Sequence, residues 1–143
     1  MDLPAQFEED LIHDLRAHLA LCQEAMDLAA RENQALASPQ GYQPAEFQLK
    51  RKDLLPRLEE SLMSLRKWRQ CWQQASPAAR SGCSEVKALF QAVQALLMKV
   101  LLLDRENQQA LLRLGLLPVR HLPATAGQQP HCVADLYRRH ARR

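Results

Sequence analysis

The fold is decided by one stretch of the chain, residues 84–115, which reads SEVKALFQAVQALLMKVLLLDRENQQALLRLG. Apolar side chains recur in it at spacings of three and four, which places them on one face of an α-helix. A second apolar row runs beside the first, so the face is wide enough to pack against two neighbouring helices. The first row is Val86, Phe90, Val93, Leu97, Val100, Asp104, Asn107, Leu111 and Leu114, and the second is Leu89, Leu96, Leu103 and Ala110. Ser84 suits an N-cap and Gly115 suits the position after a helix, so we predict a helix over residues 84–114.

The same periodicity predicts two further helices, over residues 4–37 and 44–74. The turn residues Ser38-Pro39-Gln40-Gly41 separate them, and Pro44 is a favourable first helical residue. The apolar row of the first is Phe7, Leu11, Leu15, Leu19, Cys22, Met26, Ala29, Asn33 and Leu36, and that of the second is Phe47, Leu54, Leu58, Leu62, Leu65, Trp68 and Trp72. Pro56 interrupts the second at a cost of roughly 3 kcal/mol. We expect a kink or a short break there, because the apolar pattern continues in phase on both sides.

These elements predict an all-α fold. Short connections make consecutive helices antiparallel, so residues 1–115 should form an elongated, coiled-coil-like three-helix bundle whose first and third helices are parallel. Residues 116–143 should form a short, Pro-containing C-terminal tail. Only 4 Gly and 5% aromatic residues are present, whereas 47% of residues are apolar, which is typical of a helical globular protein.

Folding the chain about its two turns sets Asn33 and Asn107 at nearly the same height. Both lie in a near-repeat, Arg31-Glu32-Asn33-Gln34-Ala35-Leu36 and Arg105-Glu106-Asn107-Gln108-Gln109-Ala110-Leu111. A buried Asn fixes register in helical bundles at some expense in stability. Our hypothesis is a structural polar layer joining Asn33 and Asn107; the alternative is two unrelated surface amides. The same folding gathers the aromatic side chains at the opposite end, namely Phe7, Trp68, Trp72 and Phe90.

The residue pattern offers no sign of catalysis. Phosphate-binding chemistry needs a Gly-rich turn before a helix, and nucleophilic catalysis needs a Ser or Cys presented beside a base. His18 and Cys22 have helical i, i+4 spacing, but no second pair completes a metal site. We therefore expect no enzymatic activity, no catalytic or metal-ligating residue, no cofactor and no small-molecule substrate.

The chain also carries the pattern of a cytoplasmic protein. Four widely spaced cysteines indicate free thiols, and the acidic N-terminus lacks the apolar core of a secretory signal. The longest apolar run, residues 95–103, contains Lys99 and is far shorter than the roughly 20 residues of a membrane span. We expect a cytoplasmic protein without a membrane span.

What remains for function is an apolar surface near the C-terminus. The tail is too rich in Pro for a long helix, yet it carries apolar side chains that either fold back along the bundle or stay mobile and dock onto a protein partner. Residues 133–139 could form two helical turns. The candidate partner-binding residues are Leu116, Leu117, Val133, Leu136 and Tyr137.

The order of features resembles the FlgN-type flagellar export chaperones. The resemblance covers residues 11–114 and depends on three runs of sequence. These are Glu32-Asn33-Gln34-Ala35-Leu36, Lys52-Asp53-Leu54-Leu55-Pro56-Arg57-Leu58, and Asn107-Gln108-Gln109-Ala110-Leu111-Leu112. It implies a non-catalytic cytoplasmic chaperone that binds hook–filament junction subunits, mainly through its C-terminal region, and delivers them to a component of the type III export gate. Pro56 and the Arg-rich tail depart from that family's pattern.

The alternative is a helical structural or regulatory module, in the form of a homodimer that binds nucleic acid through its basic tail. After Gly115 the chain holds five arginines and a single acidic residue, Asp135. Salt-dependent binding of DNA or RNA would identify this class. The sequence leaves the monomer and the homodimer open. The arginines are Arg120, Arg138, Arg139, Arg142 and Arg143.

Overall fold

The computed structural model of the chain describes residues 5–116 and 132–141. These residues form α-helices and one short 3-10 helix, with no strand among them, so the predicted all-α class is confirmed. The elements are α1 (Ala5–Ala37), η1 (Pro39–Gly41), α2 (Pro44–Gln74), α3 (Pro77–Ser81), α4 (Ser84–Arg113) and α5 (Val133–Ala141). The bounds of α1, α2 and α4 agree with the predicted ones to within one residue.

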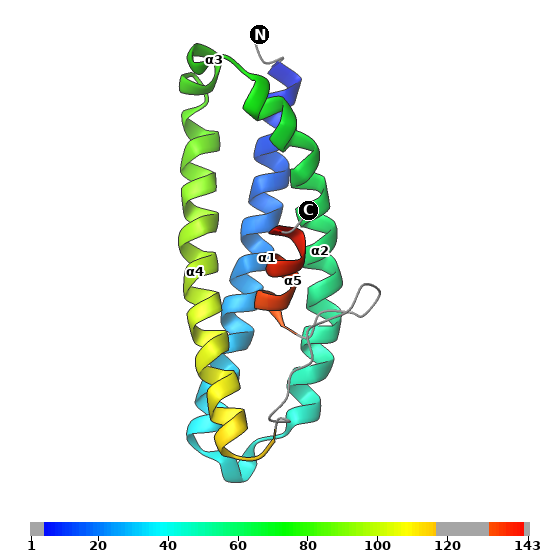
Figure 1. Cartoon of the computed structure of the whole chain (residues 1–143), viewed down its shortest axis with the longest axis vertical. Helices are drawn as coiled ribbons and strands as arrows, with labels where there is room; N and C mark the ends of the chain where they lie inside the picture. Colours follow the sequence, from blue (N-terminus) through cyan, green and yellow to red (C-terminus); the bar gives the residue numbers. More distant parts are fainter. Residues whose placement is uncertain (1–4, 117–131, 142–143) are drawn as a thin grey trace.

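The three long helices lie side by side and give the molecule the form of a rod (Figure 1). From the end that holds α3, α1 runs the length of the rod, α2 returns, and α4 runs parallel to α1. Helix α1 is the central element, since it packs against α4 along one side and against α2 along the other. The direction of the chain is therefore the one predicted from short connections.

The expected three-helix bundle is not confirmed, because a fourth helix enters the packing. Helix α5 contacts both α4 and α2 and lies beside α1 in the middle of the rod. Its Val133 and Leu136 are 7% and 0% exposed. Part of the predicted tail is thus an element of the core, and the expectations for residues 117–131 lie outside the described part of the chain.

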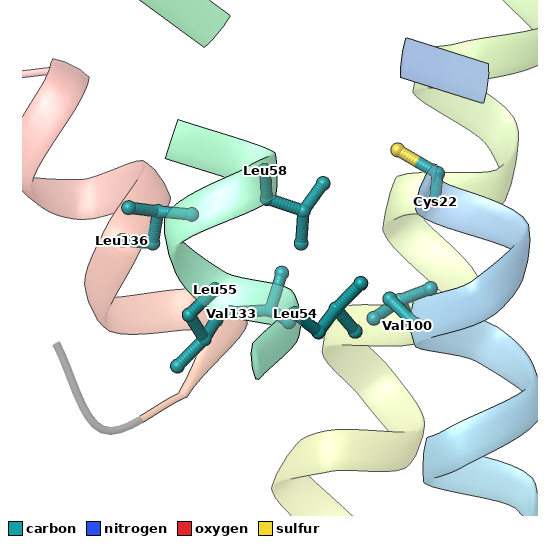
Figure 2. Close-up of a cluster of buried hydrophobic side chains, with 8 residues drawn as sticks. Cys22, Leu54, Leu55, Leu58, Val100, Val133 and Leu136 are labelled. Atoms are coloured by element: carbon teal, nitrogen blue, oxygen red, sulfur yellow. The ribbon is translucent and has the colours of Figure 1, made fainter. Parts of the chain in front are cut away.

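The central core cluster joins four helices (Figure 2). Its buried side chains come from α1, α2, α4 and α5, and they are Cys22, Ala25, Leu54, Leu55, Leu58, Val100, Val133 and Leu136. Small residues on α1 let α4 approach closely, whereas α2 contributes three leucines. Complete burial of a leucine side chain contributes about 1.5–3 kcal/mol, so Leu58 and Leu136 are principal contributors to this packing.

A second core cluster closes the end of the rod near α3. Its buried members are Phe7, Leu11, Leu15, Cys83 and Val86, with Trp68 and Trp72 packed against them. The rings of Phe7 and Trp68 meet edge to face at 5.2 Å, and those of Trp72 and Phe90 lie 6.1 Å apart. The four aromatic side chains therefore gather as the folding argument predicted.

Helix α2 runs through Pro56 without a break. A proline ring removes one backbone N–H and crowds the carbonyl four residues earlier. That carbonyl belongs to Lys52, an exposed residue, so water can satisfy it. On the opposite side Leu54, Leu55 and Leu58 are buried, and their packing holds the helix together across the proline.

Candidate protein-interaction surfaces

The five predicted partner-binding residues do not form one surface. Val133 and Leu136 are buried and Tyr137 is partly buried, all in the packing of α5 against the other helices. Leu116 is 47% exposed just beyond α4, and Leu117 lies outside the described residues. Val133, Leu136 and Tyr137 are thus engaged within the chain, because their apolar side chains complete the core between α2 and α4.

A hydrogen bond between Tyr137 and the buried His18 holds α5 against the bundle. The His18 ring lies 2.7 Å through Nε2 from the Tyr137 hydroxyl and 2.9 Å through Nδ1 from Oγ of Ser61. Sγ of Cys22 lies 3.8 Å from the same hydroxyl. Burial lowers the pKa of His18 to about 4, so this ring is neutral at pH 7. His18 and Cys22, the pair considered above as metal ligands, both contact the Tyr137 hydroxyl.

Two polar contacts at the basic end of α5 differ in how deeply they are buried. Nε2 of His140 lies 3.3 Å from Oε1 of Glu59 on α2, with the histidine side chain 9% exposed. Arg138, 63% exposed, lies 3.7 Å from Asp135 one turn earlier. Arg142 and Arg143, which belong to the nucleic-acid alternative, fall outside the described residues.

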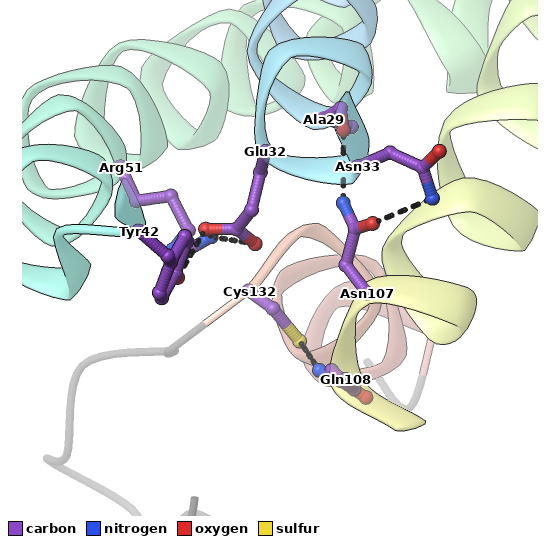
Figure 3. Close-up of polar contacts among 8 residues, drawn as sticks. All are labelled: Ala29, Glu32, Asn33, Tyr42, Arg51, Asn107, Gln108 and Cys132. Carbon is purple, nitrogen blue, oxygen red and sulfur yellow. Dashed lines mark hydrogen bonds and ion pairs between the residues drawn. The ribbon is translucent and has the colours of Figure 1, made fainter. Parts of the chain in front are cut away.

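Asn33 and Asn107, predicted to form a polar layer, are brought together between α1 and α4 (Figure 3). Nδ2 of Asn33 donates to Oδ1 of Asn107 over 3.0 Å, and Nδ2 of Asn107 donates to the Ala29 carbonyl over 2.9 Å. Asn107 is 1% exposed. Buried amides with satisfied hydrogen bonds favour one register of two helices over its neighbours.

A buried charged pair next to this layer was missed by the sequence reading. Glu32 is 1% exposed, and both of its carboxylate oxygens lie 2.8 Å from Nη1 of Arg51 on α2. The Tyr42 hydroxyl also donates to Glu32 over 3.1 Å. Charged residues of a helix usually face water, so the apolar pattern gave no sign that Glu32 is more deeply buried than its neighbour Asn33.

Asp104 belongs to the same polar region, but its carboxyl group is incompletely hydrogen-bonded among the described residues. It is 7% exposed, and its Oδ2 atom has no hydrogen-bond partner among the described residues. Burial raises the pKa of Asp104 to about 6, against the opposing attraction of Arg51. Its place in the apolar row of α4 was the one sequence signal of this buried carboxyl group.

Helix α4 lies at one edge of the rod (Figure 1), and several of its apolar side chains are exposed. Met98 and Leu102 are 56% and 60% exposed. They belong to a row of exposed residues with alternating spacings of three and four, which we call the outer seam. The outer seam is Ala88, Gln91, Ala95, Met98, Leu102, Arg105, Gln109 and Leu112. Sequence reasoning assigned α4 a wide apolar face made of two other rows and did not single out this one.

By length and composition α4 is apolar enough to cross a membrane, and it is the one helix of the described residues with this property. The same properties are typical of a helix that packs against protein on more than one side. Lys99 lies near the middle of this helix, and α1 packs along it. Both features suit a protein environment.

Two shallow concave surfaces lie between α1 and α2. The larger, about 490 Å³, is lined mostly by charged side chains, and Leu49 at its edge is 69% exposed. The smaller, about 300 Å³, lies around Asp14, Ser61 and Arg57. Among residues 5–116 and 132–141 no three His, Cys, Asp or Glu side chains are placed to hold a metal ion.

Comparison with known proteins gives one result: no protein-family model, curated protein or solved structure matches this chain.

Proposed function

We propose that this chain is a non-enzymatic chaperone that binds a helical segment of another protein, in the manner of the FlgN-type flagellar export chaperones it resembles. The partners implied are hook–filament junction subunits, which the chaperone keeps soluble in the cytoplasm and delivers for type III export. The proposal depends above all on the outer seam of α4.

The outer seam supports binding of a helix because of its spacing and shape. Exposed side chains at intervals of three and four form a narrow stripe along residues 88–112 of α4, the pattern of a coiled-coil contact. Ala88 and Ala95 leave room for close approach, while Met98 and Leu102 offer flexible apolar contacts. Exposed apolar surface on a folded helix commonly marks an interaction site.

The outer seam also changes the location expected for partner binding. The family resemblance implies the C-terminal region, but Val133 and Leu136 are already buried against α2 and α4. Binding through them would require α5 to leave its place, whereas binding along α4 leaves the core intact. We therefore propose the outer seam as the principal contact.

The experiment is co-purification of the full chain with each hook–filament junction subunit encoded in the same genome. Leu102→Glu places a charge in the middle of the outer seam, and Leu49→Glu on α2 is the matched control, since Leu49 is 69% exposed and Leu102 is 60% exposed. We expect a complex with the wild type and with Leu49→Glu, and at least a tenfold weaker complex, about 1.4 kcal/mol, with Leu102→Glu. Absence of any complex with the wild type, at concentrations that keep both proteins soluble, would contradict the proposal.

A further inference from the structure

The cations along α4 have no ion-pair partners in the described part of the chain. Lys87, Lys99, Arg105 and Arg113 are all exposed, and none forms an ion pair with another described residue. Of the two carboxylates on the outward side of this helix, Glu85 is paired with Arg16 of α1. Only Glu106 remains to offset four positive charges, so the outward side of α4 is basic.

Three of these cations border the outer seam and the fourth, Arg105, lies within it. At 3.6 residues per turn, Lys99 and Arg113 project on one side of the seam and Lys87 projects on the other. The arrangement is that of a coiled-coil strand, in which an apolar seam is flanked by charged positions that select the partner. A partner helix with the same flanking charge would be repelled along its length.

We propose that the outer seam of α4 receives an amphipathic helix whose apolar stripe is flanked by acidic residues. This inference rests on the proposed function, since it describes the chemistry of the segment that the chaperone binds. Glu or Asp at the flanking positions of the partner would pair with Lys87 and Lys99, and its small or branched apolar residues would pack against Met98 and Leu102. Charge complementarity of this kind determines specificity and association rate more than affinity.

A protein helix fits this surface better than a membrane does. Helices that lie on membranes present a broad apolar sector, whereas the outer seam is narrow and interrupted by Gln91 and Gln109. These amides can form hydrogen bonds with a facing helix but would be poorly accommodated among lipid chains. Binding to lipid is therefore the competing outcome of the test.

The test uses two synthetic helical peptides of about four heptads with identical Leu and Ala seams. One carries Glu at the flanking positions and the other carries Lys. We expect the full chain to bind the Glu peptide at least tenfold more tightly than the Lys peptide. This preference should shrink at high salt, because the Debye length shortens and the charges are screened. The double variant Lys87→Glu/Lys99→Glu should reverse the preference, whereas Lys52→Glu/Lys67→Glu, exposed positions on α2, should leave it unchanged.

Several results would overturn the inference. These are equal affinity for both peptides, preference for the Lys peptide, failure of both to bind, and binding to phosphatidylglycerol vesicles that Leu102→Glu abolishes. The test of this inference and the test of the proposed function can fail independently. If a junction subunit binds and the charge reversal has no effect, the inference fails and the proposed function stands. If only the Glu peptide binds and no subunit does, the proposed function fails.

Discussion

The hydroxyl of Tyr137 lies 2.7 Å from Nε2 of His18, and this contact joins the last described helix to the first. The two residues are 119 positions apart in the sequence. His18 is 1% exposed and has no access to water that could replace the contact. The position of α5 is therefore determined by polar contacts with α1 and α2 as well as by the burial of Leu136.

Replacing Tyr137 with Phe should destabilise the protein and loosen α5. The substitution keeps the ring but leaves Nε2 of the buried His18 without a partner, at a cost of about 1–3 kcal/mol. Urea unfolding measures the loss, and hydrogen exchange should rise first over residues 133–141. The control is Arg138→Ala, because this exposed side chain forms only a surface pair with Asp135. Equal exchange in wild type and Tyr137→Phe would contradict the account of α5.

His18 should make the protein less stable in mild acid. Its pKa is about 4 when folded and about 6.5 when unfolded, so only the unfolded chain takes up the proton between these values. Above pH 6.5 both states are neutral and the contribution is complete. It declines as the pH falls from 6.5 to 4, by on the order of 3 kcal/mol. The free energy of unfolding of His18→Gln, measured over this range, should depend less steeply on pH than that of the wild type.

The ionisation of Asp104 changes the stability in the opposite direction to that of His18, over nearly the same pH range. Its pKa is about 6 when folded and 3.8 when unfolded, so its stabilising contribution is complete below pH 3.8 and is lost as the pH rises through 6. Asp104→Asn should therefore raise the free energy of unfolding at pH 7, by up to about 3 kcal/mol, with no gain at pH 3.5. A destabilised variant at pH 7 would show that the unpaired Oδ2 is satisfied in solution. Parallel denaturant titrations at the two pH values decide this.

Arg51 should be far more important for stability than a similar arginine on the same helix. Arg51→Ala leaves the buried carboxylate of Glu32 without its ion pair, which typically costs about 3–5 kcal/mol. Arg57 pairs with Glu24 and Asp53 at the surface, so Arg57→Ala should barely alter the midpoint of thermal unfolding. Similar midpoints for the two variants would show that water reaches Glu32.

The long helices were predictable because local signals agree with packing. Residues 84–114 repeat apolar side chains with helical spacing, and Pro39, Gly41 and Pro44 mark the turn between the first two helices. Asn33 and Asn107 could be paired because the positions of the two turns determine how far along the bundle each residue of the three long helices lies. Each of these inferences needs only the chain's own periodicity.

Other features depend on contacts that periodicity does not contain. Helix α5 spans nine residues, and its position is determined by Tyr137 meeting His18 and Leu136 entering the core between α2 and α4. The burial of Glu32 depends on Arg51, a partner in another helix. The exposure of Leu102 could not be predicted either, because an apolar row shows that a helix can pack and not whether anything covers it.

The measurement that tests the central claim most directly is the affinity of one hook–filament junction subunit for three proteins, namely the wild type, Leu102→Glu and Leu116→Glu. Leu102 lies in the outer seam, whereas Leu116 is the exposed residue among the described members of the predicted C-terminal surface. Our account predicts that Leu102→Glu weakens binding at least tenfold and that Leu116→Glu binds like the wild type. Loss of binding in Leu116→Glu with wild-type affinity in Leu102→Glu would contradict it and would place the contact at the C-terminal end of the chain.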